Sequence, residues 1–522
     1  MDKPFSSTDN LKKNMKLILA FAWMSSNVFA QTTGPELQYI VSTPQPGTHY
    51  YHVELQASHW PGDTLIFRMP RWTPGYYQLM NYADAVEHFA GKDDVNRVLR
   101  VEKSINQWRV EGVKDRAFSV SYYIKAERQF VAQSYLDSAR GYIVPASLFL
   151  YIDGYLDIPV QIKLDINKSW QVATGLTQVA GKQNEFRAPD FDTLYDCPIL
   201  MGNLETLPPF RINGIEHRFI GYKLGTFDRV RFMKSLEQMT ASAAAIIGDI
   251  PFDRYTFIGI GPGRGGIEHL NNTTVSFDGS GLNSPEAMNR MMNFLTHEYF
   301  HHYNVKRIRP LELGPFDYDS GSKTNLLWVS EGLTVYYEYV IMKRAGLIDE
   351  KTLYADFQNN IDATENNPGR FHQSLAQASY KTWSDGPFGN QGNDPQKSIS
   401  YYDKGPVVGL LLDFAIRNAT QNRKSLDDVM RLLYWKYYKK LNRGFTDAEF
   451  EQACETVSET SMTGFFEYVY TTRELDYNTY LGYAGLKINV VEVNQKRKFT
   501  LERLDIMNEL QSATLKNWLG EP

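Results

Sequence analysis

The chain has 522 residues, of which 22% are charged, and a formal net charge of −5 at pH 7. This length predicts about three domains. The slightly acidic balance argues against a nucleic-acid partner, because lysines and arginines are scattered and form no basic field. The two cysteines, Cys197 and Cys454, match no zinc or redox spacing, so we expect both to be free and buried unless the fold brings them together.

The first 30 residues have the pattern of a secretory signal peptide. A lysine-rich stretch, Leu11–Lys16, precedes the short apolar run Leu17–Met24, and Val28–Ala30 offers small residues at a cleavage position. We expect cleavage near Ala30 and a periplasmic or secreted protein, with Met15 an alternative start. The apolar run is shorter than the ~20 residues of a membrane helix, although an uncleaved anchor is an alternative. No other uninterrupted apolar span occurs in the sequence, so we expect no membrane contact beyond this segment.

Residues 31–205 have the alternating pattern of β-strands. Apolar and polar residues alternate in short runs, such as Tyr50–Gln56 and Phe118–Ile124, with turn residues between them. A period of two indicates strands with one buried face. We therefore expect an N-terminal antiparallel β domain.

A glycine-rich stretch, Gly259–Gly266, comes next. A phosphate-binding loop would lead directly into a helix, whereas this stretch is followed by the β-like run Thr273–Phe277. We interpret it as an edge strand at which Gly265 and Gly266 let a peptide substrate approach and pair with the backbone. Glu268 lies at the end of this strand; taken alone, it is better explained, with His269, as an ordinary turn pair.

A helix is predicted after Ser284. Ser284–Glu286 supplies a capping serine, a proline at the first helical position and an acid in the first turn. Apolar residues then recur at helical spacing. Pro310 sets the outer limit of this helix, and Asn304 is an earlier stop signal.

This helix carries a candidate zinc site. His297 and His301 are four residues apart and share one helix face, so both can bind one Zn²⁺ ion per chain. Glu298 would lie beside the metal and accept a proton from a bound water. Glu331, just before the apolar helical run Val335–Met342, is the best third ligand, although an acid at a helix N-terminus is also common for other reasons.

The last part of the chain is expected to be mostly helical. The apolar runs Val407–Ile416 and Leu426–Leu433 predict helices within a region spanning 405–480. Residues 481–522 form a tail with short strands and a helix. The segment Asp385–Gln396 is rich in Gly, Pro and Asn, and we interpret it as a connector or a lid.

Five motifs occur in order between about residues 35 and 520. They are Met69–Tyr77, Gly265–His269, His297–His301 with Asn304–Pro310, Trp328–Gly332, and Ser400–Gly405. Together they resemble the glycyl aminopeptidase family of gluzincin metallopeptidases, distant relatives of the aminopeptidase N group. The resemblance implies a multidomain α+β protein, in which a thermolysin-like catalytic domain over 206–404 follows the β domain and precedes the helical region.

The resemblance also implies roles for two further residues. Glu268 would bind the α-ammonium group of the substrate. Tyr402, two residues before Lys404 and Gly405, would donate a hydrogen bond to the oxyanion. Tyr401 is adjacent to Tyr402, and spacing alone does not exclude it from this role.

The chain departs from the family pattern in two respects. Many members carry a PDZ domain after the helical region, but only about 40 residues follow Tyr480, so we expect this domain to be absent. His302 and Tyr303 replace the usual threonine and tryptophan. We expect His302 to lie beside the site or at the surface, and not to be a fourth ligand.

These patterns predict a zinc-dependent aminopeptidase. Its substrates would be peptides with a free N-terminus, and the resemblance suggests glycine or alanine as the residue removed. The alternatives are a thermolysin-like endopeptidase and a non-catalytic secreted binding protein on the same scaffold. The sequence does not indicate an oligomeric state.

Overall fold

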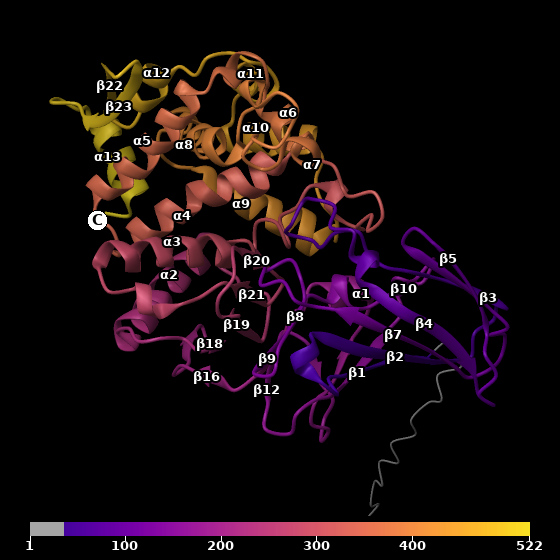
Figure 1. Cartoon of the computed structure of the whole chain (residues 1–522). Helices are drawn as coiled ribbons and strands as arrows, with labels where there is room; N and C mark the ends of the chain where they lie inside the picture. The colour runs from indigo at the N-terminus through magenta and orange to yellow at the C-terminus, as the bar shows by residue number, and fades with distance from the viewer. Residues whose placement is uncertain (1–35, 522) are drawn as a thin grey trace, which may run out of the picture. The chain divides into compact units, whose positions relative to one another are not determined.

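The structure, a computed structural model, describes residues 36–521. The expected signal segment, residues 1–30, lies outside this range. Strands make up most of the first part and helices most of the last part (Figure 1). No helix in the described range has the length and apolar character needed to cross a membrane.

The largest sheet of the β region has seven strands. They are β1 (Glu36–Ser42), β2 (Tyr50–Ser58), β4 (Val86–Asp93), β7 (Phe118–Lys125), β11 (Val160–Asp165), β13 (Thr177–Gln178) and β14 (Glu185–Ala188). Their spatial order is β13-β14-β11-β1-β2-β7-β4. The predicted strands Tyr50–Gln56 and Phe118–Ile124 correspond to β2 and β7, which alternate between buried and less buried residues. The pairing is antiparallel as expected, except between β1 and β11, which are parallel.

Two four-stranded sheets complete the β region. One contains β3 (Thr64–Arg68), β5 (Arg100–Ser104), β6 (Gln107–Glu111) and β10 (Tyr151–Ile152). The other contains β8 (Tyr135–Leu136), β9 (Arg140–Ile143), β12 (Gln171–Thr174) and β15 (Ile199–Gly202). The short helix α1 (Phe191–Tyr195) precedes β15. Large aromatic side chains such as Trp60 and Trp108 fill the core of this region. Cys197 is buried there, and both cysteines are free, as predicted.

A second sheet system begins near residue 204. It contains β16 (Leu204–Thr206), β17 (Phe210–Ile212), β18 (Ile215–Tyr222), β19 (Arg254–Gly259), β20 (Gly266–Glu268) and β21 (Asn272–Val275). The spatial order is β16-β18-β19-β21-β20, with β17 also paired to β18. β20 pairs only with β21 among the described strands, so it is the edge strand expected for the glycine-rich segment.

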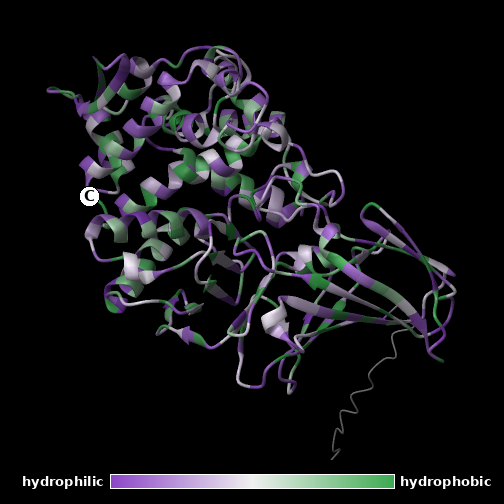
Figure 2. Ribbon diagram, viewed as in Figure 1, coloured by the Kyte–Doolittle hydropathy of each residue, from purple (hydrophilic) through white to green (hydrophobic). Residues whose placement is uncertain are grey.

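Thirteen α-helices lie within the described residues. After α1 they are α2 (Arg229–Ile247), α3 (Pro285–Phe300), α4 (Leu333–Arg344), α5 (Glu350–Asn366), α6 (Leu375–Tyr380), α7 (Thr382–Asp385), α8 (Tyr401–Ala419), α9 (Leu426–Leu433), α10 (Asp447–Ser458), α11 (Thr463–Tyr470), α12 (Tyr477–Gly482) and α13 (Glu509–Leu519). α3 packs against α4, and α4 packs against α8. The predicted apolar run Val407–Ile416 lies within α8 and is fully buried, and Figure 2 shows hydrophobic residues gathered along these central helices.

The helix boundaries refine two expectations. α3 ends at Phe300, before the expected stop at Asn304, and His301 is its C-cap residue. The expected boundary between residues 404 and 405 falls inside α8, so Tyr402 lies in the first turn of that helix. In the tail, β22 (Leu486–Val493) and β23 (Lys496–Arg503) form a hairpin that packs against α5.

Candidate metal centre

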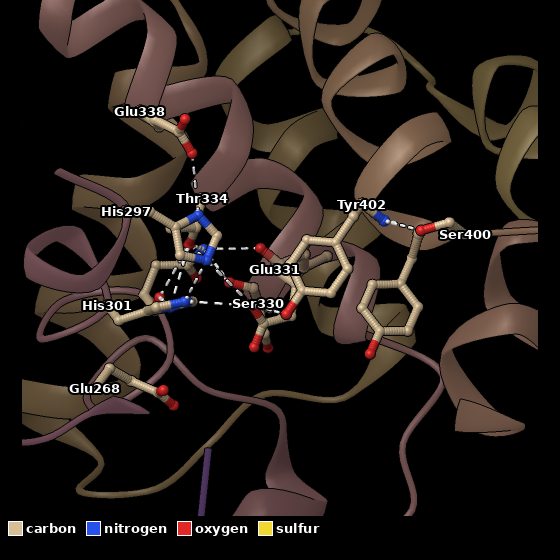
Figure 3. A network of polar contacts seen from close by, with 12 residues as sticks. Glu268, His297, His301, Ser330, Glu331, Thr334, Glu338, Ser400 and Tyr402 are labelled. Carbon is tan, nitrogen blue, oxygen red and sulfur yellow. Dashed lines mark hydrogen bonds and ion pairs between the residues drawn. The ribbon is translucent and has the colours of Figure 1, made fainter. Parts of the chain in front are cut away.

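The two histidines of the motif lie on one face at the end of α3. Ser284 caps the start of this helix by accepting a hydrogen bond from the amide of Ala287, and Pro285 occupies its first position. The helical spacing directs the imidazoles of His297 and His301 toward each other, with 2.9 Å between their Nε2 atoms (Figure 3).

Glu331 completes a group of three converging side chains. It lies in a π-helical turn, Trp328–Gly332, that leads directly into α4. Its Oε2 atom is 3.5 Å from Nε2 of His297 and 3.2 Å from Nε2 of His301. Within the described residues, these three are the group whose ligand atoms lie close enough together to hold one metal ion.

The spacing of the three ligand atoms fits a tetrahedral metal. Zinc binds nitrogen and oxygen at about 2.0–2.1 Å, so the ligand atoms of a tetrahedral ion lie roughly 3.3 Å apart. The observed separations of 2.9, 3.2 and 3.5 Å are close to that value. Two imidazoles and one carboxylate are also the donor set typical of a catalytic zinc site, which keeps a fourth position for water.

The outer nitrogen of each imidazole also has a partner. Nδ1 of His301 lies 2.7 Å from the carbonyl oxygen of Asn304, and Nδ1 of His297 lies 3.3 Å from Oε2 of Glu338. Because these partners are acceptors, each Nδ1 carries the proton, and each Nε2 presents a lone pair toward the shared centre. Glu338 was not predicted, although it is the one acid in the apolar run Val335–Met342.

Glu298 lies beside the ligands in a buried setting. Its side chain is 5% exposed, and its Oε2 atom has no hydrogen-bond partner. Burial raises the pKa of Glu298 to about 7. A Cβ atom on Gly266 would lie 2.5 Å from Oε1 of Glu298, so glycine is needed for β20 to approach this carboxyl group. Gly265 has a φ angle of +80°, which glycine adopts without strain.

Glu268 ends the edge strand at the other side of the site. It is 3% exposed, and its Oε1 atom has no hydrogen-bond partner. The ammonium group of Lys306 lies 3.9 Å from this oxygen and makes a closer ion pair, 2.8 Å, with Asp196. Glu268 and Lys306 both line a cavity of about 110 Å³, and Oε1 of Glu268 could accept a hydrogen bond from a small cationic group there.

The structure distinguishes Tyr402 from Tyr401. The hydroxyl of Tyr402 donates a 2.8 Å hydrogen bond to Oε2 of Glu331, whereas the hydroxyl of Tyr401 pairs with Thr382 at 3.0 Å. Ser400 caps α8 by accepting from the amide of Tyr402. Burial and the carboxylate of Glu331 both raise the pKa of Tyr402, so its phenol stays protonated and can donate.

Two glycines hold the tyrosine and the third ligand together. A Cβ atom on Gly332 would lie 2.7 Å from Cα of Gly405, and a Cβ atom on Gly405 would lie 2.6 Å from Cα of Gly332. Only a pair of glycines allows this backbone approach. Glu331 directly precedes Gly332, and Tyr402 lies one helical turn before Gly405.

The segment Asp385–Gln396 lies next to this site. Phe388, which is mostly exposed, has its ring 5.5 Å from that of Tyr402. Gln391 accepts a 2.8 Å hydrogen bond from Gln78 of the β region. The segment therefore contributes to the rim of the site, a role that its Gly, Pro and Asn content did not reveal.

His302 does not join the ligands. Its ring is fully buried against Tyr299, Tyr303 and Phe252, and neither ring nitrogen has a hydrogen-bond partner. This position agrees with the expectation that His302 is not a fourth ligand. The alternative expectation, that His302 lies at the surface, is wrong because the residue is fully buried. Burial in an aromatic cluster lowers the pKa of His302 and favours the neutral ring.

Comparisons with known proteins agree with this geometry. Family models match residues 38–203, described as the peptidase M61 N-terminal domain, and residues 290–408, described as M61 glycyl aminopeptidase. A search of curated proteins returned no match. Among solved structures, an aminopeptidase N family protein from Idiomarina loihiensis is 25% identical, with a TM-score of 0.81 over 87% of this chain and 79% of that one.

More distant structures share the fold. An M1 zinc metallopeptidase from Deinococcus radiodurans, a mutant bound to a Tyr-Ser-Ala substrate, is 13% identical, with a TM-score of 0.52 over 85% of this chain and 95% of that one. Legionella pneumophila aminopeptidase A, in complex with aspartic acid, is 11% identical, with a TM-score of 0.54 over 90% and 57% of the two chains. The expected fold class, including the thermolysin-like catalytic domain, is thus confirmed.

Removing the outer partner of His297 is expected to weaken metal binding. Glu338→Ala frees Nδ1, so the imidazole loses its fixed tautomer and orientation, and zinc affinity should fall about 10–100-fold. Glu338→Gln keeps an acceptor oxygen, so its zinc affinity should fall less than that of Glu338→Ala. The matched control is Glu286→Ala, the same change at an exposed acid in the first turn of α3. Competition with a chelator measures the affinity, and equal affinities in the wild type and Glu338→Ala would contradict the assignment.

Proposed function

The chain belongs to the M61 glycyl aminopeptidase family, and on that premise we propose that it is a zinc aminopeptidase that removes a small N-terminal residue, glycine or alanine, from peptides. The metal would be held, one ion per chain, by His297, His301 and Glu331. The signal-like pattern of residues 1–30 supports a periplasmic or secreted location.

The observation that carries the proposal is the buried carboxylate of Glu268 close to the ligand group. Its Oε1 atom has no hydrogen-bond partner and lies 3.9 Å from the ammonium group of Lys306, and its carboxylate raises the pKa of both Glu298 and His301. A buried carboxylate favours a cationic partner. A peptide whose α-ammonium group binds Glu268 would have its first peptide bond beside the metal ligands.

The edge strand would orient the substrate. β20 pairs with β21 on one side and has no strand partner on its other side among the described strands. A peptide can therefore add to the sheet as a further strand. The pairing would align the first peptide bond of the substrate between Glu298 and Tyr402. This would hold the bond in the orientation that the reaction requires.

Proton transfer and charge stabilisation would be divided between two side chains. Zinc, when bound, polarises the scissile carbonyl and lowers the pKa of a water molecule toward ~7. Glu298 accepts the proton of that water and delivers it to the leaving amine; its pKa of about 7 suits both steps. The phenol of Tyr402 turns from Glu331 to donate a hydrogen bond to the oxyanion that develops on the carbonyl oxygen.

Loss of the general base should separate catalysis from metal binding. Glu298→Gln is nearly the same size and removes no metal ligand, so zinc content and melting temperature should match those of the wild type. Turnover of alanine amide should fall about 10²–10⁴-fold, the usual contribution of a positioned base. Full residual activity, with zinc retained, would contradict the role of Glu298.

Loss of the ammonium-binding carboxylate should affect free N-termini selectively. Glu268→Gln should lower kcat/KM for alanine amide about 10–100-fold, the value of a charged hydrogen bond. N-acetylalanine amide should remain a very poor substrate of both proteins. Glu286→Gln, the same change at an exposed acid in the first turn of α3, is the control.

The same panel separates an aminopeptidase from an endopeptidase. Efficient cleavage of blocked peptides by the wild type would favour a thermolysin-like endopeptidase. An equal loss on free and blocked substrates in Glu268→Gln would show that this carboxylate does not bind the amine.

A further inference from the structure

A tyrosine of the β region lies inside the site and has no role in the mechanism above. Tyr77 is only 8% exposed and lines the same cavity as Glu268. Burial, together with the nearby carboxylates of Glu331 and Glu268, raises the pKa of Tyr77. One phenol is thus close to both a metal ligand and the group proposed to bind the amine.

A tight turn fixes the position of Tyr77. The amide of Tyr76 donates to the carbonyl of Thr73, and the indole of Trp72 donates a 2.6 Å hydrogen bond to the carbonyl of Asp317. Gly75, at a φ angle of +91°, lies against the site, since a Cβ atom there would be 2.8 Å from Oε2 of Glu268. The turn is therefore seated on Glu268 itself, and a residue with a side chain at position 75 would displace it.

Two tryptophans flank the ring of Tyr77. The ring centroids of Trp72 and Trp383 lie 6.4 and 6.3 Å from that of Tyr77. Trp72 is fully buried, and it also packs edge-on against Trp383 at 5.1 Å. This support leaves the phenol ring little freedom to move aside for a substrate.

The position of Tyr77 has a consequence for the substrate. The first residue of a bound peptide would extend from its ammonium group at Glu268 to its carbonyl carbon at the metal ligands. A side chain close to both Glu268 and Glu331 lies alongside that residue. We propose that Tyr77 forms the wall of the subsite for the N-terminal side chain and restricts it to glycine and alanine. This inference rests on the proposed aminopeptidase function.

The cavity that Tyr77 lines is small, about 110 Å³, and the rest of its lining is mixed. Asp192, Asp196, Lys306 and Arg309 are charged, whereas Leu313 and Phe316 are apolar. A leucine or phenylalanine side chain entering there would displace water from the charged groups without replacing its hydrogen bonds, which is unfavourable. Removing the ring of Tyr77 would instead open space beside Trp72 and Trp383, an apolar surface.

The test compares substrate selectivity in variants of the full-length zinc-loaded protein. The readout is the ratio of kcat/KM for leucine amide to that for alanine amide. Tyr77→Ala should raise this ratio about tenfold or more, the usual effect of added space in an apolar subsite. Tyr77→Phe keeps the ring and should leave the ratio unchanged. Tyr77→Trp narrows the subsite and should lower activity on alanine amide relative to glycine amide.

The adjacent Tyr76 is the matched control. It lies in the same turn, but its ring packs against Phe130 at 5.2 Å. Tyr76→Ala should leave the selectivity ratio at the wild-type value. An equal shift in Tyr76→Ala would overturn the proposal, because distortion of the turn would then be the cause.

Other outcomes separate this inference from the function on which it rests. An unchanged ratio in Tyr77→Ala, with zinc content retained, overturns the role of Tyr77 and leaves the aminopeptidase function standing. If Tyr77→Ala does not fold, the test is the ratio of kcat/KM for alanine amide to that for glycine amide in Tyr77→Trp. A ratio equal to that of the wild type would overturn the role of Tyr77. A wild-type protein that cleaves none of the three amides overturns the proposed function itself.

Discussion

The backbone contact between Gly332 and Gly405 is the constraint on which the site depends most. It brings the turn that carries Glu331 against the first helical turn of α8, which carries Tyr402. Any side chain at either glycine would have to displace backbone atoms, and the two helices would separate. The 2.8 Å hydrogen bond between Tyr402 and Glu331 follows from this approach. The ligand group and the oxyanion donor are thus positioned by backbone packing as well as by their own hydrogen bond.

Buried charge is the second feature that the fold must accommodate. Glu268, Glu298 and Glu331 are nearly inaccessible to water, and burying a charged group is costly unless it is paired. Two imidazoles compensate Glu331, and the ammonium group of Lys306 lies near Glu268, whereas Glu298 has an unpartnered oxygen. Such an arrangement costs stability and is usual at functional sites. A bound cation and the α-ammonium group of a substrate would offset this cost.

The sequence alone predicted most of the zinc site, because the His297–His301 spacing and the helix cap are local patterns. It also predicted β20 as an edge strand. It did not predict Glu338, since the partner of an imidazole nitrogen depends on how α3 and α4 pack. Nor did it separate Tyr401 from Tyr402, a choice that the rotation of α8 decides. The position of Tyr77 depends on contact between regions almost 200 residues apart, which no local pattern encodes.

The central claim is that His297, His301 and Glu331 bind one zinc ion. X-ray absorption at the zinc edge of the purified protein tests it most directly, together with metal analysis. The account predicts about one zinc per chain, coordinated by two imidazole nitrogens and by oxygen atoms at roughly 2.0–2.1 Å. Zinc that is absent, or that is coordinated by fewer than two imidazoles, would contradict it.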